Sequence, residues 1–155
     1  MMNRLLVSLL FISLLFTSCS KLGQVEIKEL NVKSFRLINT SSAHVEVEFI
    51  IHNPTNKELL LCNADGVLKR GEVNFALVSL QHCDTVAANR VSVNTLVFKL
   101  DLLDPISLLS MGLNLSQWKF SDFRVDARAV IKPLPGRKRV IKIKNIPLEN
   151  LSKRL

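Results

Sequence analysis

Residues 43–56 read Ala-His-Val-Glu-Val-Glu-Phe-Ile-Ile-His-Asn-Pro-Thr-Asn, and the expected fold extends outward from them. Apolar side chains recur at every second position, at Val45, Val47, Phe49 and Ile51. Glu46 and Glu48 take the other parity, so the pattern predicts a strand with one buried face. Asn53-Pro54 ends this strand, because proline has no N–H to donate to a neighbouring strand and disfavours helix at the residue before it.

The rest of the chain contains similar short apolar runs, separated by turn-forming residues. They predict strands at residues 25–38, 59–64 with a continuation at 67–68, 73–77 (alternating Val73, Phe75 and Leu77), 91–102, 123–131 and 137–146. About seven strands at short spacing, with one short helix, indicate an all-β chain folded as an antiparallel β-sandwich. A chain of this length fits one domain with its own core.

Two of the predicted strands change apolar parity, which a regular strand cannot do. In residues 25–38 the parity shifts twice, so bulges are expected near Glu29 and Lys33, in an edge strand. In residues 91–102 the apolar positions change from odd to even numbers. A further bulge is therefore expected between Thr95 and Phe98.

One internal helix is predicted, Pro105–Met111, which would plug one end or edge of the sandwich. Asp104 suits its N-cap, Pro105 suits the first helical position, and Gly112 is placed to end it. Residues 149–155 form a predicted helical turn or tail.

The first 18 residues are typical of a secretory signal peptide. Arg4 supplies the positive charge, residues 5–16 are almost entirely apolar, and small polar residues follow. The run is too short for a comfortable membrane span. Residues 16–19, Phe-Thr-Ser-Cys, resemble the lipobox of bacterial lipoproteins, with phenylalanine where leucine is usual.

This lipobox resemblance implies cleavage before Cys19 and acylation of its thiol and its new amine. Removing residues 1–18 from the 155 leaves a mature chain of 137 residues, in which residues 19–24 form a lipidated tether. Each buried methylene contributes about 0.8 kcal/mol, so three acyl chains would anchor the protein essentially permanently. In lipoproteins of this kind, an aspartate directly after the lipidated cysteine favours retention in the inner membrane. This chain has Ser20 at that position, so the same resemblance implies a periplasm-facing protein that is anchored in the outer membrane rather than the inner membrane.

The mature chain is basic. Without Arg4 it has 20 basic and 13 acidic residues, a net charge of about +7. One group of cations lies in the last predicted hairpin, at Arg137, Lys138, Arg139, Lys142 and Lys144. These side chains are candidates for binding anionic headgroups or an acidic partner, and a solvated charged face is the simpler alternative.

Cys62 and Cys83 remain once Cys19 is assigned to lipidation. An exported compartment permits a disulfide between them, but their spacing does not place the two Cα atoms within bridging distance. We expect two buried free thiols, with the disulfide as the alternative.

Taken in order, these segments resemble the late-embryogenesis-abundant type 2 family, also called the water-stress and hypersensitive-response domain. The resemblance rests on a valine-rich strand that runs into Asn53-Pro54-x-Asn56, on Leu-Leu-Leu-Cys-Asn-Ala at residues 59–64, and on a turn with Gly71. Residues 87–90, Ala-Ala-Asn-Arg, add to it, and the match spans residues 25–148. It implies a sandwich of the immunoglobulin or fibronectin type III kind and a role in stress protection, and it does not imply a catalytic site.

Few residues suggest chemistry. Asn53 is expected to form an Asx turn, so Asn53, Pro54 and Asn56 are interpreted as structural. His44 and His52 lie about 26 Å apart on one strand and cannot share a metal, while His82-Cys83-Asp84 lacks the spaced ligand pairs of a zinc site. No serine elbow, phosphate loop or twin-cysteine motif occurs. We therefore expect no enzyme, metal or cofactor, and no nucleic acid as partner.

The leading hypothesis is a lipid-anchored, non-enzymatic periplasmic domain that binds or protects envelope components. Its partners would be the membrane, through Cys19, and an envelope protein or lipid. The alternative is a carrier of lipid or of another small apolar ligand, in a cavity lined by Leu108, Leu109 and Trp118. The oligomeric state stays open.

Overall fold

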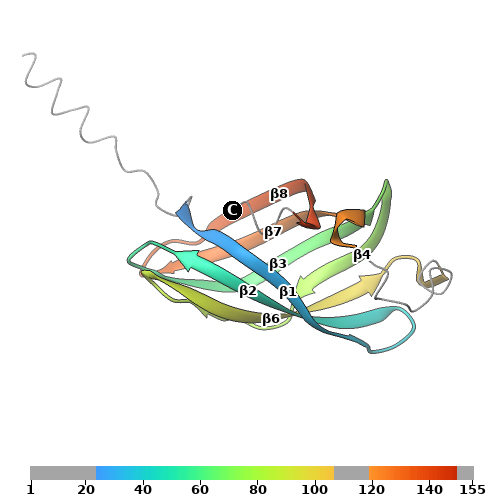
Figure 1. Cartoon of the computed structure of the whole chain (residues 1–155), viewed down its shortest axis with the longest axis horizontal. Helices are drawn as coiled ribbons and strands as arrows, with labels where there is room; N and C mark the ends of the chain where they lie inside the picture. The colour runs from blue at the N-terminus through green and yellow to red at the C-terminus, as the bar shows by residue number, and fades with distance from the viewer. Residues whose placement is uncertain (1–23, 107–118, 150–155) are drawn as a thin grey trace, which may run out of the picture.

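The computed structural model describes residues 24–106 and 119–149 of the 155. Strands account for most of these residues (Figure 1). Their bounds are β1 Glu26–Leu37, β2 Ser42–Asn53, β3 Glu58–Arg70, β4 Val73–Leu80, β5 Asp84–Val86, β6 Arg90–Leu102, β7 Phe123–Leu134 and β8 Arg139–Pro147. A 3₁₀ turn, η4 (Phe120–Asp122), precedes β7.

The strand pairs are antiparallel, which confirms the predicted all-β class. Their hydrogen-bonded order is β1-β2-β6-β4-β3-β7-β8, with β5 paired to β3. β4 is shared, because residues 76–80 pair with β6 and residues 73–79 pair with β3. The sandwich is therefore one continuous sheet that folds over at β4. We call β1, β2 and β6 the first layer, and β3, β7 and β8 the second layer.

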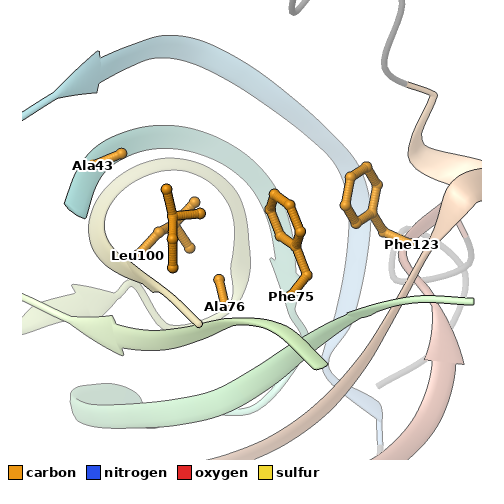
Figure 2. Close-up of a cluster of buried hydrophobic side chains, with 6 residues drawn as sticks. Ala43, Phe75, Ala76, Leu100 and Phe123 are labelled. Carbon is orange, nitrogen blue, oxygen red and sulfur yellow. The ribbon is translucent and has the colours of Figure 1, made fainter. Parts of the chain in front are cut away.

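Two clusters of apolar side chains lie between the layers. The first combines Ala43 of β2, Phe75 and Ala76 of β4, Leu100 and Leu102 of β6, and Phe123 of β7 (Figure 2). Phe75 and Phe123 meet edge to face, with ring centroids 5.5 Å apart. The second cluster combines Val25, Ile27, Ile51, Leu59 and Val86. Burial of these side chains, at about 25 cal/mol per Å² of apolar surface, holds the two layers together.

The alternation predicted around residues 45–51 is confirmed in β2, where Ala43, Val47 and Ile51 are buried. β1 lies at the edge of the sheet and pairs with β2. Its two register shifts fall between residues 27 and 29 and between residues 32 and 34, which confirms the bulges expected near Glu29 and Lys33. Bulges and charges on an edge strand hinder the addition of a foreign strand.

The bulge predicted between Thr95 and Phe98 is wrong. β6 pairs with β2 from Arg90 to Asp101 without a register shift, and its buried positions are even-numbered throughout. Asn94 is buried in an inward position, whereas the odd-numbered apolar residues of this segment had predicted that it points outward. Its Nδ2 donates to Asp84 Oδ2 at 2.8 Å and to the carbonyl oxygen of Thr85 at 3.1 Å. A buried polar side chain that is fully bonded thus interrupted the apolar pattern.

β3 is a single strand, although the sequence suggested two segments separated at Asp65-Gly66. Gly66 is required there, because a Cβ atom would lie 2.5 Å from the backbone oxygen of Asp126 on β7. In β4, the predicted alternation fails at Val73 and Leu77, which are exposed. The register between β3 and β4 shifts at this point: Leu68 pairs with Ala76 and Lys69 with Asn74, so Phe75 is an extra residue of β4, and both Phe75 and Ala76 are buried.

Cys62 and Cys83 form a disulfide, so the expected pair of free thiols is wrong. Cys62 lies at the register shift of β3 against β7, and Cys83 directly precedes β5. β5 pairs with β3, placing Leu61 opposite Asp84. This pairing brings the two Cα atoms to within 4.0 Å of each other.

The predicted helix lies mostly outside the described residues, as do residues 150–155 of the predicted tail. The N-cap hydrogen bond expected at the start of this helix is present, since the N–H of Ile106 donates to Asp104 Oδ1 at 3.1 Å. This is the bond that an aspartate N-cap makes.

Candidate functional site

Asn53 ends β2 and is completely buried, with 0% of its surface exposed. Its Nδ2 donates to the carbonyl oxygens of Lys57 at 2.9 Å and of Ala87 at 3.0 Å. Its Oδ1 accepts from the backbone N–H of Thr55 at 3.1 Å and from the Thr55 hydroxyl at 2.7 Å. The expected Asx turn is therefore present, and the same side chain also ties the β2–β3 loop to the segment after β5.

A backbone bond joins the same two loops. The N–H of Asn89 donates to the carbonyl oxygen of Thr55 at 2.8 Å. Asn89 has a φ of 52°, a left-handed conformation that asparagine adopts more readily than most residues. Pro54 is half-buried and Asn56 is exposed in the β2–β3 loop. Asn53, Pro54 and Asn56 thus lie where β2 runs into the β2–β3 loop, which hydrogen bonds join to the β5–β6 connection that contains Asn89.

The second candidate site is the outer face of the second layer. In the β7–β8 hairpin, Ile141 and Ile143 lie opposite Ala129 and Ala127. The alternate positions point outward and carry the charges. We define the basic face by the outward residues of three strands, namely Lys69 of β3, Arg124 and Arg128 of β7, and Lys142 and Lys144 of β8.

Strand register places these cations side by side. Arg128 lies opposite Lys142 on one side and opposite Asp65 on the other. Lys69 lies opposite Arg124. The basic face also contains two carboxylates, those of Asp65 and Asp126. Its five cations outnumber them, so the face has a net positive charge.

Asp126 accepts two short bonds on this face. Lys69 Nζ lies 2.6 Å from its Oδ2, and the backbone N–H of Asn145 donates to its Oδ1 at 2.6 Å. The hydrogen bond from Lys69 and then that from Asn145 hold the pKa of Asp126 below the usual range of an aspartate, and the charge of Lys144 adds to this. Asp126 is therefore ionised at neutral pH.

A bulge in β8 shapes this part of the face. The register shifts between Val125 and Ala127, and Asn145 adopts a φ of 52°. Arg124 donates from Nε to Asn145 Oδ1 at 2.6 Å and from Nη2 to the Asn145 carbonyl oxygen at 2.8 Å. A hollow of about 530 Å³ lies here, lined by Lys69, Gly71, Glu72, Arg124, Asp126, Lys144 and Asn145. Such a surface can hold an anionic group by charge and hydrogen bonding.

The structure divides the five predicted basic residues into two groups. Lys142 and Lys144 belong to the basic face, whereas Arg137, Lys138 and Arg139 are exposed at the end of the β7–β8 hairpin. Sequence reasoning did not include Lys69, Arg124 or Arg128 among the candidates. The outward parity of Arg124 and Arg128 was an available signal, but Lys69 joins them through strand pairing.

None of the three histidines is among the residues that form the two candidate sites. His44 and His52 take the outward parity of β2, and His82 is exposed before β5. In residues 24–106 and 119–149, no group of three or more His, Cys, Asp or Glu side chains is placed to hold a metal ion. Within the same ranges, no helix has the length and apolar character that a membrane crossing requires. Cys19, Leu108, Leu109 and Trp118 lie outside the described residues.

The fold and the candidate surface define an all-β domain of two antiparallel layers with a basic outer face. Comparison with family models and with curated proteins found no match. Among solved structures, the chain is similar to a protein from Archaeoglobus fulgidus, with a TM-score of 0.45 and 10% identity, over 76% of this chain and 93% of that one. It is also similar to the solution structure of a candidate late embryogenesis abundant protein, with a TM-score of 0.30 and 13% identity, over 94% of this chain and 87% of that one.

Proposed function

We propose that this chain is a lipid-anchored, non-enzymatic domain of the bacterial cell envelope that binds or protects other envelope components. Cys19 would carry the lipid, and the periplasm-facing domain would begin a few residues later, at Val25. The signal-like residues 1–18 and the lipobox resemblance support the anchor. The resemblance of residues 25–148 to the late-embryogenesis-abundant type 2 family supports a protective role.

The observation that carries the binding role is the basic face. Lys69 is ion-paired with Asp126 at 2.6 Å, and Arg128 lies 3.8 Å from Asp65. The remaining cations of the face give it a net positive charge. Exposed charges on a strand surface favour encounter with an oppositely charged partner. The partner we propose is therefore an acidic segment of an envelope protein.

The carrier alternative depends on Leu108, Leu109 and Trp118, which the structure does not describe. In the described part of the chain, side chains from both layers contact one another in two apolar clusters. The hollow at Asp126 lies on the outer surface and is lined by polar and charged residues and one glycine. These observations favour an interaction domain over a carrier.

The anchor is tested with the full chain carrying Cys19→Ala. Wild-type protein is expected in the membrane fraction after an alkaline carbonate wash, and the variant is expected in the soluble fraction. A matched control, Cys62→Ala with Cys83→Ala, should stay in the membrane fraction. Retention of the Cys19→Ala chain in the washed membranes would contradict the anchor.

The basic face is tested by photo-crosslinking in intact cells. A photoreactive amino acid replaces Val140, which is 49% exposed and adjoins Lys142 on the outer side, or Val93, which is 63% exposed on the first layer. An envelope-protein adduct is expected from position 140 and not from position 93. Lys142→Glu with Lys144→Glu should abolish this adduct. Equal adducts from both positions, or an adduct that survives the charge reversal, would defeat the proposal.

A further inference from the structure

The start of the domain lies at one end of the sandwich together with three connections between strands, namely the β2–β3 loop, the β5–β6 connection and the end of the β7–β8 hairpin. Val25 and Ile27, at the start of β1, pack in one cluster with Leu59 and Val86. Leu59 also pairs with Pro133, beside the end of the β7–β8 hairpin. Figure 1 shows the start of β1, the β2–β3 loop and the hairpin end on the same side of the molecule. We call this side the tether end, because residues 19–24 directly precede it in the chain.

Positive charge is concentrated at the tether end. Its exposed cations are Lys57, Arg90, Arg137, Lys138 and Arg139. Its exposed carboxylates are Glu26, which is ion-paired with Lys28, and Glu58. The described residues at the opposite end include Arg36, Arg70 and Lys119 with Glu72, Asp104, Asp122 and Glu149. Lys69, Arg124 and Lys144 lie beside Glu72 and Asp126 in the hollow at this opposite end, so its charges nearly balance, whereas the tether end has an excess of positive charge.

Buried hydrogen bonds set the positions of the tether-end loops. Asn53 bonds the carbonyl oxygens of both Lys57 and Ala87, at 2.9 and 3.0 Å. The N–H of Asn89, the residue before Arg90, donates to Thr55. Lys57 and Arg90 thus extend from backbone that is already ordered. An ordered surface loses less conformational entropy when it binds.

We propose that the tether end is a membrane-contact surface, which binds the anionic phospholipid headgroups of the membrane that holds the lipid anchor. This inference rests on the lipidation of Cys19 that the proposed function includes. Six extended residues from Cys19 span about 20 Å at most, so the tether end stays close to the headgroups. Attraction between lysine or arginine and anionic lipid acts over a Debye length of about 8 Å at physiological salt.

Contact through the tether end also orients the domain. The opposite end has nearly balanced charge, so attraction to anionic headgroups favours the orientation in which the tether end faces the membrane. β7 and β8 run between the two ends, so the basic face extends away from the membrane surface. A domain held in this way could bind an acidic envelope protein with its basic face while the tether end rests on lipid.

The test uses the full-length lipoprotein, purified from membranes and reconstituted into vesicles of phosphatidylcholine alone or with added phosphatidylglycerol. Trypsin cleavage after Arg137, Lys138 and Arg139 is compared with cleavage after Arg70, which ends β3 at the β3–β4 turn of the opposite end. Phosphatidylglycerol is expected to slow cleavage of the hairpin about tenfold without changing cleavage at Arg70. High salt should remove the difference, because it screens the attraction.

Two charge-matched variants localise the effect. Lys57→Glu with Arg90→Glu should abolish the protection of the hairpin, whereas Lys142→Glu with Lys144→Glu should keep it. Equal hairpin cleavage in both kinds of vesicle, or equal loss of protection in both variants, would overturn the inference. A chain that fails to associate with phosphatidylcholine vesicles would instead contradict the lipid anchor of the proposed function. Unchanged cleavage at Arg70 shows that each variant is folded.

Discussion

The side chain of Asn53 donates a hydrogen bond of 3.0 Å to the carbonyl oxygen of Ala87, 34 residues further along the chain. Within the sequence, Asn53-Pro54 indicated a local turn. In the structure, Asn53 also holds the segment between β5 and β6 in place. Its burial makes these bonds important, because water cannot easily replace a lost partner inside the protein.

Asn53→Ala is expected to lower the free energy of unfolding by about 3 kcal/mol, because the carbonyl oxygens of Lys57 and Ala87 lose the donor that the buried Asn53 side chain supplies. Urea unfolding of the mature chain measures this change. Asn56→Ala is the control, since Asn56 is exposed in the same loop and should change stability by less than about 0.5 kcal/mol. Similar losses in the two variants would contradict the role assigned to Asn53.

Replacing Cys62 and Cys83 together by alanine is expected to lower the free energy of unfolding by about 3 kcal/mol, the chain-entropy value for a loop of this length. The two cysteines are 21 residues apart in the sequence. Peptide mapping without reduction should recover the peptides of Cys62 and Cys83 as one linked product. Alkylation of both thiols in the unreduced, folded protein would contradict the disulfide.

Stability should depend on pH through Asp126. Its pKa is lower in the folded chain, chiefly because of the hydrogen bond from Lys69. A carboxylate with a lowered pKa stabilises the fold above its unfolded-state value of about 3.9, and this stabilisation is lost as the pH falls through the folded-state pKa. Asp126→Asn should therefore be less stable than wild type by a constant amount between about pH 5 and pH 8, and the difference should shrink below about pH 4.

Urea unfolding at a series of pH values checks the prediction for Asp126. Asp65→Asn is a matched control, because its carboxylate lies farther from its cation, 3.8 Å from Arg128, and is more exposed. The control should differ less from wild type at neutral pH. An Asp126→Asn difference that stayed constant into strong acid would rule out the linkage.

Gly66 and Gly71 should respond differently to substitution. Gly66→Ala is expected to destabilise the fold by about 2 to 3 kcal/mol, because the new Cβ would meet the Asp126 backbone oxygen at 2.5 Å. Gly71 has a φ of 60° and open space around it, so Gly71→Ala should cost about 1 kcal/mol through conformation alone. Gly71→Asn should cost less than Gly71→Ala, since asparagine tolerates this conformation. Thermal unfolding distinguishes the cases, and equal losses for asparagine and alanine would argue against the conformational cause.

The inner and outer faces of β2, β7 and β8 were predictable because side-chain direction in a strand alternates with a period of two residues. The outward positions of Lys142 and Lys144 follow from this period. The bulges of β1 were predictable for the same reason, since a change of parity is visible within the strand. In β6 the reasoning failed at Asn94, whose buried position depends on Asp84 in another segment.

Local periodicity therefore predicted most of the strands, the buried faces of β2, β7 and β8, and the all-β class, but not β5 or the buried faces of β4 and the first part of β6. It could not establish which strands are neighbours. Pairing of β3 with β7 brings Lys69 to Asp126, and pairing of β3 with β5 brings Cys62 to Cys83. The gathering of Lys57, Arg90 and Arg137 at one end likewise depends on the folding of the sheet. Contacts of this kind join residues far apart in the chain and are set by tertiary packing and strand register, which no local pattern specifies.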